Sequence, residues 1–190
     1  MKTWVTRNGF LSEDEMKSNA RLVWERLSEE GFSDNAIAGI LGNMECESTI
    51  NPGIWEGLQP YIGGYGLVQW TPYEKYSDWA GEDWQNNGDK ECQRIAYEFR
   101  EGIQYYASVE FPITASEFKS SSASPEELAG AWMYNYERPW SYDTEWYRAE
   151  RARYWYDLIP SFREASKEDP KPEAPKRKAV GRAWLLSSRD

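Results

Sequence analysis

The chain has 190 residues and a formal net charge of −10, with 22 basic and 32 acidic side chains. It contains no histidine, which excludes Ser-His-Asp triads, Cys-His nucleophile pairs and His-ligated zinc centres. So acidic a chain repels nucleic acid phosphates, and a mean hydropathy of −0.84 without a long apolar run predicts no membrane span. Carboxylates, tyrosines, lysines and two cysteines are left to carry any chemistry.

Capping patterns predict that the first third of the chain contains two helices. Ser12 and Glu15 have the spacing of a capping box, which opens a helix that Gly31 ends. Ser33 caps the second helix, whose apolar stripe consists of Ile37, Ile40, Leu41 and Met44.

The segment Trp55–Trp70 differs from its surroundings, because it places four glycines between short apolar runs. Such a pattern is typical of a small hairpin with an irregular loop. We therefore predict an α+β domain that is mainly helical, with one small β-hairpin after the second helix.

Further helices are expected in the second half of the chain. Thr71-Pro72 and Ser124-Pro125 each have a capping residue before a proline at the first helical position. Pro139 ends the helix that Ser124 opens, and a last helix is predicted near Thr144–Leu158. Between them runs an amphipathic stripe that consists of Cys92, Ile95, Phe99, Ile103 and Tyr106.

The composition changes after Pro160. Residues 161–190 contain eight basic and five acidic residues, and 167–178 read KEDPKPEAPKRK. A proline-rich charged pattern is typical of an extended linker. We predict one catalytic domain over residues 1–160 and a linker or tail over residues 161–190, in which the basic run 176–178 is solvated.

Glu47 lies near the end of the second predicted helix. At 100° per residue from Ile37, Glu47 falls at about 280° and Ile40 at about 300°, at the margin of the apolar face. A carboxyl group at such a margin is desolvated, which suits a general acid, although a solvated glutamate at a helix end fits the spacing as well. Glu45 falls at about 80°, so the two carboxylates cannot share one cleft.

Three motifs in order resemble the phage-tail lysozyme family, a branch of the lysozyme-like superfamily related to goose-type lysozymes and lytic transglycosylases. They are Glu47–Pro52 (ESTINP), Gly64–Trp70 (GYGLVQW) and Tyr136–Pro139 (YERP). The resemblance covers about residues 10–160 and implies a lysozyme-like fold. It also implies a muramidase that cuts the β-1,4 bond between N-acetylmuramic acid and N-acetylglucosamine.

The resemblance assigns roles to single residues. Glu47 matches the catalytic glutamate that protonates the leaving oxygen. Substrate-binding roles are expected for Ser48, Tyr65, Gln69, Trp70 and Tyr136. Several of these have structural alternatives, because Ser48 could finish its helix, Trp70 could belong to the core, and the Tyr136 hydroxyl could hold Glu47 instead of substrate. We interpret Glu137 and Arg138 as a structural ion pair.

The mechanism is open at this point, because no Asp or Glu lies between Gly57 and Tyr73 to supply a second carboxylate in the hairpin. A single-acid or inverting hydrolysis is favoured, and a lytic transglycosylase reaction through the C6 hydroxyl of the sugar is the alternative. No metal or organic cofactor is implied. The expected substrate is the glycan strand of bacterial peptidoglycan, with neither nucleic acid nor membrane as a partner.

Two biological settings fit the resemblance. A tail-tip lysin in the phage virion, in contact with other tail proteins, is favoured over a free endolysin that stays in the host cytoplasm until lysis. A non-catalytic wall-binding tail module is the alternative from another class. The first ten residues do not read as an export signal, so Cys46 and Cys92 are expected to be two thiols rather than a disulfide.

Overall fold

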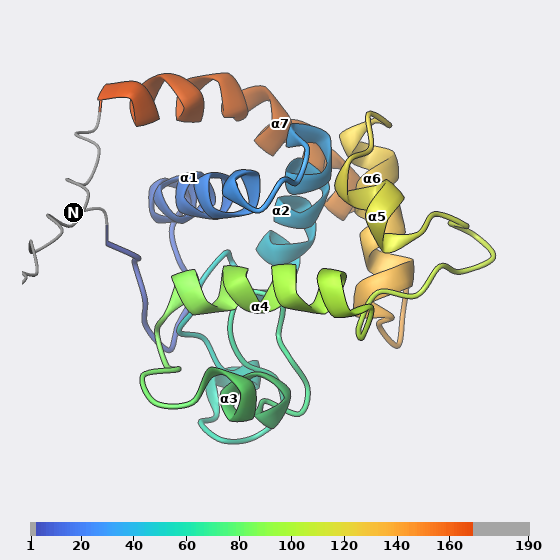
Figure 1. The fold of residues 1–190 in the computed structure, drawn as a ribbon. Helices are drawn as coiled ribbons and strands as arrows, with labels where there is room; N and C mark the ends of the chain where they lie inside the picture. Colours follow the sequence, from blue (N-terminus) through green and yellow to red (C-terminus); the bar gives the residue numbers. More distant parts are fainter. Residues whose placement is uncertain (1–2, 169–190) are drawn as a thin grey trace, which may run out of the picture.

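The computed structural model describes residues 3–168, and this part of the chain is mainly helical (Figure 1). Its elements are α1 (Glu13–Glu29), α2 (Asp34–Ser48), the 3-10 turn η1 (Glu56–Leu58), α3 (Glu74–Ala80), α4 (Gly88–Glu101), α5 (Ala115–Lys119), α6 (Pro125–Trp132), the π-helical turn η2 (Met133–Glu137) and α7 (Glu145–Glu168). No helix in the described range is long and apolar enough to cross a membrane.

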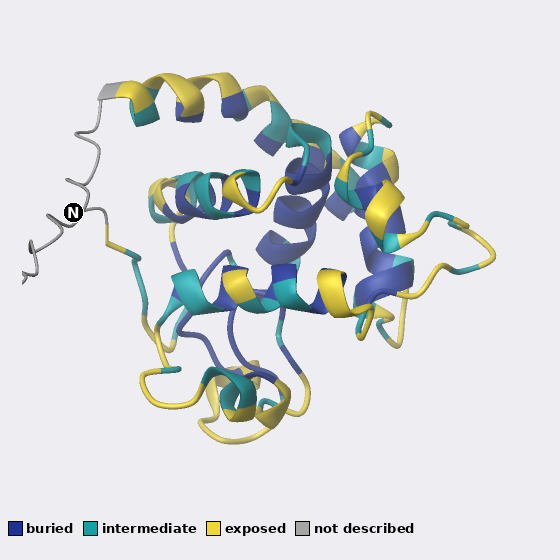
Figure 2. Cartoon of the chain, in the orientation of Figure 1, coloured by how far each residue is buried: buried dark blue, intermediate teal, exposed yellow. Residues whose placement is uncertain are grey.

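Helix α2 is the centre of the domain. Residues 36–45 are all buried, and Figure 2 shows α2 almost wholly in the buried colour between α1, α6 and α7. Two glycines allow this close packing. A Cβ on Gly39 would lie 2.8 Å from the Leu128 backbone of α6, and a Cβ on Gly42 would lie 2.7 Å from the Ala152 nitrogen of α7. The three helices therefore approach at backbone distance, which fixes where the end of α2 lies.

Three of the predicted caps are confirmed, whereas the predicted helix start at Thr71-Pro72 is wrong, because α3 begins at Glu74 with Tyr73 as its N-cap. Ser12 and Glu15 form the capping box of α1, and the Ser33 hydroxyl accepts a hydrogen bond from the Ala36 amide at 3.1 Å. Ser124 caps α6, with Pro125 in its first turn. Each cap satisfies an amide that the helix itself leaves without an acceptor.

The predicted β-hairpin is wrong, because the described chain has no strand. Residues 55–70 make only two isolated bridges, Trp55 with Tyr65 and Tyr65 with Trp70. The backbone turns back repeatedly, and the residues with positive φ here are Gly57, Leu58, Tyr61, Gly63, Gly66 and Gln69. The Gln69 side-chain amide also donates to the carbonyls of Ile54 and Gly66, at 3.3 and 2.9 Å. Repeated turns and this side-chain bonding replace the regular ladder that a hairpin needs.

Many of the aromatic residues form the core of the domain. One cluster packs the loop region below α4, where the Tyr65 ring lies 4.6 Å from Trp55 and 4.9 Å from Trp84. A second cluster joins α4, α6 and η2, where Trp132 stacks on Tyr136 with ring centroids 4.0 Å apart. The high tryptophan and tyrosine content therefore serves packing as well as the pocket described below.

Helix α7 continues to Glu168, eight residues past the predicted boundary at residue 160. Phe162 is buried in the core, and Arg163 forms an ion pair with Asp34 of α2. The beginning of the predicted tail is therefore part of the helical domain. Residues 169–190, with the rest of the predicted linker and the basic run 176–178, lie outside the described residues, and their assignment stays a prediction.

Candidate active site

A pocket of about 330 Å³ opens at the C-terminal end of α2. Four of the predicted site residues line it, namely Glu47, Gln69, Trp70 and Tyr136. Other segments complete the wall and contribute further residues, among them Phe10, Glu56, Lys75, Gln104, Glu137 and Pro139. The structure thus brings residues of all three motifs to one site.

Glu47 is held by a buried arginine that sequence analysis did not find. Arg148 of α7 donates from Nη2 to Glu47 Oε1 at 2.6 Å. Its Nη1 donates to Asn43 Oδ1 at 2.8 Å, and its Nε to Thr144 Oγ1 at 3.1 Å. Arg148 is 5% exposed, so the guanidinium is fixed from three directions and holds the Glu47 carboxylate at the pocket.

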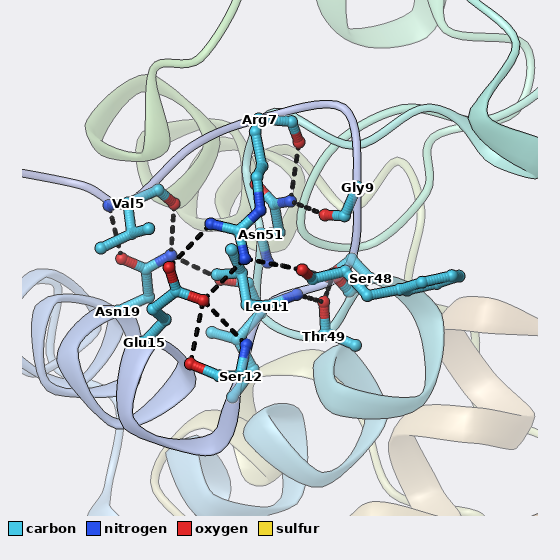
Figure 3. Close-up of polar contacts among 12 residues, drawn as sticks. Val5, Arg7, Gly9, Leu11, Ser12, Glu15, Asn19, Ser48, Thr49 and Asn51 are labelled. Atoms are coloured by element: carbon cyan, nitrogen blue, oxygen red, sulfur yellow. Dashed lines mark hydrogen bonds and ion pairs between the residues drawn. The ribbon is translucent and has the colours of Figure 1, made fainter.

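The chain just before α1 secures the end of the helix that carries Glu47 (Figure 3). Thr49 caps α2 in the left-handed conformation, with φ of 53°, and its hydroxyl accepts from the Leu11 amide at 3.0 Å. The Asn51 side chain donates to the carbonyls of Arg7 and Gly9, at 2.8 and 2.7 Å. These bonds hold the N-terminal segment against the turn that follows Glu47, and the same segment places Phe10 at the pocket.

Ser48 and Tyr65 lie behind the pocket wall and do not line it. The Ser48 hydroxyl is buried, 2.8 Å from the Leu67 carbonyl and 2.9 Å from the Met44 carbonyl. The Tyr65 hydroxyl accepts from the Asn86 amide at 2.7 Å, and the residue is 1% exposed. In this arrangement the Ser48 hydroxyl bonds the end of α2 to the loop that carries Gln69, and the Tyr65 hydroxyl bonds that loop to Asn86.

Trp70 and Tyr136 belong to the pocket lining, but they are only 3% and 1% exposed, and their polar atoms point to Glu98 of α4. Trp70 Nε1 donates to Glu98 Oε1 at 3.1 Å, and the Tyr136 hydroxyl donates to Glu98 Oε2. Arg94 completes the set with an ion pair to Glu98 at 2.7 Å. Burial raises the pKa of Glu98. The Tyr136 hydroxyl is therefore bonded to Glu98, and Glu98 anchors two walls of the pocket.

A second carboxyl group, Glu137, shares the pocket with Glu47. Its Oε1 accepts from Trp132 Nε1 at 2.7 Å, across the π-helical turn η2. The surrounding protein desolvates this carboxyl group and the Glu47 charge repels its ionised form, so the pKa of Glu137 lies well above its usual range. The YERP motif contained this residue, but nothing in its spacing separated a pocket carboxylate from a structural one.

The predicted ion pair between Glu137 and Arg138 is wrong. Arg138 ends η2 in the left-handed conformation, and its Nη1 donates to the carbonyls of Gln104 and Asn135, at 2.8 and 2.6 Å. The reversal of the backbone at Arg138 directs the two neighbouring side chains to different partners. Glu137 is consequently left in the pocket without an arginine of its own motif.

Glu45 lies on another side of α2, as the helical spacing predicted. Its carboxylate accepts from Arg151 Nε at 2.7 Å, Trp155 Nε1 at 2.8 Å and the Tyr147 hydroxyl at 3.1 Å. All three donors belong to α7. Glu45 therefore fastens α7 to α2, while Glu47, two residues on, lines the pocket.

Neither cysteine lines the pocket, and both are free thiols. Burial raises the pKa of the Cys46 thiol and raises that of Cys92 well above its usual range. A thiol with a raised pKa is a poor nucleophile at neutral pH. Within residues 3–168, no group of three or more Cys, Asp or Glu side chains is arranged to hold a metal ion.

The site is a glutamate-bearing pocket in a helical domain, and comparison with known proteins identifies the family. Residues 18–159 match the family described as phage tail lysozyme. The chain belongs to the phage tail lysozyme family, as its three motifs predicted. It is 39% identical over 160 residues to Morphogenesis protein 1 of Bacillus phage B103, an alignment that covers 82% of this chain and 43% of the phage protein. The chain thus spans less than half the length of that relative.

Proposed function

We propose that the chain is a muramidase that hydrolyses the β-1,4 bond between N-acetylmuramic acid and N-acetylglucosamine in peptidoglycan, with Glu47 as the general acid. The observation that carries the proposal is the position of Glu47, which stands at the pocket beside a buried arginine and on a helix end fixed by three segments. Membership of a family named for lysozyme activity supports the same reaction.

The walls of the pocket suit a sugar chain. Phe10 and Leu58 are exposed at the pocket and offer apolar surface against which pyranose rings can pack, and Gln69 and Gln104 offer amide groups for hydroxyl and N-acetyl groups. A carboxylic acid at such a wall can protonate the glycosidic oxygen while positive charge develops on the sugar ring. Hydrolysis by this route uses carboxyl groups and water alone.

Mass spectrometry of the fragments released from purified Gram-positive peptidoglycan tests the reaction. Reducing-end N-acetylmuramic acid is the expected product, and 1,6-anhydro ends would identify a lytic transglycosylase instead. Release of peptides alone would overturn the glycosidase proposal. Binding without release of any fragment would favour a wall-binding module.

A place in the virion is the setting we propose, because the family name refers to the phage tail and the name of the phage relative refers to morphogenesis. Antibody detection of the chain in purified particles is the direct test. A chain found only in the lysate and never in particles would favour the endolysin alternative.

A further inference from the structure

Three glutamates line the pocket. Glu56 accepts from the Gly64 amide at 2.7 Å, Glu47 pairs with the buried guanidinium of Arg148, and Glu137 has neither of these partners. Arg148 pairs with Glu47 at 2.6 Å, and it also donates to Asn43 and Thr144. An arginine fixed in this way is placed to balance a single negative charge. Arg148 forms no ion pair with the second carboxyl group, Glu137, although its charge favours the ionised form of that group and so opposes the effect of burial.

Among residues 3–168, the one side-chain donor to Glu137 is neutral, namely the indole N–H of Trp132 at 2.7 Å. No Lys or Arg within residues 3–168 forms an ion pair with it. The charged groups that face it or share its pocket are Glu47 of α2, Glu98 of α4, Arg148 of α7, Lys75 of α3 and Glu56 of η1. Negative neighbours and an aromatic surrounding both favour the protonated form of Glu137.

We propose that Glu137 is the second carboxyl group of the reaction and shares one proton with Glu47, while Arg148 balances the one negative charge that remains. This inference rests on the proposed function. Two interacting carboxyl groups in one pocket titrate as a pair, so the proton belongs to the pair and can move between its members.

The shared proton gives the hydrolysis a balanced cycle. Glu47 donates its proton to the glycosidic oxygen as the bond to the anomeric carbon breaks. Water forms the new bond to that carbon, and the Glu137 carboxylate takes the proton that the water releases. The pair then carries its proton on Glu137 and its charge on Glu47, which are the forms that Trp132 and Arg148 stabilise in the substrate-free protein. Transfer of the proton from Glu137 to Glu47 restores the acid.

The variant Glu137→Gln tests this role without removing the structural contact. Its amide oxygen can still accept from Trp132, but the side chain can neither take up nor release a proton. We expect kcat on peptidoglycan to fall by about 10²–10⁴-fold, with peptidoglycan binding and the thermal unfolding midpoint retained. Glu150→Gln is the matched control, because it removes one carboxylate from the exposed side of α7 and should leave kcat unchanged.

The pH profile separates a chemical role from a structural one. If activity requires one proton shared between Glu47 and Glu137, the plot of activity against pH is bell-shaped for the wild type and for Glu150→Gln. The residual activity of Glu137→Gln should lose the acid limb, because the carboxyl group whose protonation causes that limb has been removed. A Glu137→Gln enzyme with a wild-type bell and kcat within about threefold of wild type would overturn the inference. The proposed function would stand in that case as long as Glu47→Gln is inactive.

A measurement that needs no Glu137 variant guards against misfolding. In protein labelled with ¹³C at the glutamate carboxyl carbons, the resonances of Glu91, Glu98 and Glu137 should titrate above the usual range, and only that of Glu137 is expected to depend on Glu47. In Glu47→Gln the midpoint of Glu137 should fall by at least about one pH unit, because a negative neighbour is lost and Arg148 is released. If no remaining glutamate changes its midpoint, the two carboxyl groups do not share a proton and the inference fails.

Discussion

Arg148 of α7 and Glu47 of α2 lie 101 residues apart in sequence and are joined by a 2.6 Å ion pair. The side chain of Arg148 is 6% exposed and that of Glu47 is 22% exposed, so one partner belongs to the core and the other reaches the pocket. The pair therefore connects the packing of two helices to the chemistry of the site.

Replacing Arg148 with methionine should destabilise the fold and the site together. The change leaves Glu47 and Asn43 without their partner, and loss of one member of a buried pair costs about 3–5 kcal/mol. Urea denaturation measures the difference. Arg153→Met, also on α7, is the control, since the ion pair of Arg153 with Glu126 of α6 is exposed and should contribute less than about 1 kcal/mol. An equal loss of unfolding free energy in the two variants would show that the buried Arg148–Glu47 pair contributes no more than the exposed one.

Adding a methyl group at Gly42 should separate α7 from α2. The new Cβ would lie 2.7 Å from the Ala152 nitrogen and 3.0 Å from its Cβ, so the helix backbone must shift. We expect a loss of about 1–3 kcal/mol in the free energy of unfolding, with reduced activity because Arg148 moves with α7. Gly9→Ala makes only ordinary contacts at 3.9 Å or more and should change stability by less than about 0.5 kcal/mol. An unchanged free energy of unfolding in Gly42→Ala would show that the α2–α7 interface can accommodate the added methyl group.

Glu45→Gln and Glu47→Gln should differ in the activity that remains per folded molecule. Glu45→Gln weakens the bonds to Arg151, Trp155 and Tyr147 and should cost about 1–3 kcal/mol, while folded molecules remain active. Glu47→Gln leaves the buried Arg148 without its carboxylate and also lowers stability, but its folded molecules should keep sugar binding and lose nearly all turnover. Specific activity corrected for the folded fraction, measured beside thermal unfolding, distinguishes the two patterns. Full activity in Glu47→Gln would remove the basis of the proposed mechanism.

Glu91 should make the protein less stable as the pH rises. Its carboxyl group is buried under Gly66, and Oε1 has no hydrogen-bond partner, while Oε2 accepts from the Leu67 amide at 2.7 Å. Burial raises its pKa well above the usual range. The folded state then holds a proton that the unfolded state releases near pH 4.3, so the stabilising contribution is complete below about pH 4.3 and is lost as the pH rises toward the folded pKa.

The variant Glu91→Gln provides the test, because it cannot ionise. Its free energy of unfolding should fall less steeply with pH above about 4.3 than that of the wild type. Denaturation curves at a series of pH values measure both slopes. Parallel slopes would show that Glu91 is not protonated in the folded state.

Local sequence signals predicted the helices well, because caps and apolar stripes act within one or two turns. Ser12, Ser33 and Ser124 each satisfy amides of the turn that they open. The loop region resisted prediction for the opposite reason. Residues such as Leu58, Tyr61 and Gln69 adopt positive φ under tertiary constraint, and neither hydrophobic pattern nor composition reports that constraint.

The sequence predicted some residues of the candidate site but not the partners that hold them in place. Glu47 could be placed at a margin of its helix and matched to a motif, but its partner Arg148 depends on the packing of α7 against α2. Glu137 was misread because its neighbour Arg138 offered a simple local pair. Its actual partner is Trp132, reached through a π-helical turn that helical periodicity of 3.6 residues does not anticipate.

The long separation between Glu47 and Arg148 also sets an order of events during synthesis. Glu47 leaves the ribosome about a hundred residues before Arg148, its ion-pair partner. The pocket residues of the nascent domain can therefore rearrange until α7 has packed against α2. Local detachment of α7 in the finished protein would reverse only this last step. The pocket is therefore expected to form last in folding and to be lost first when a protease or a mild denaturant frees the final helix.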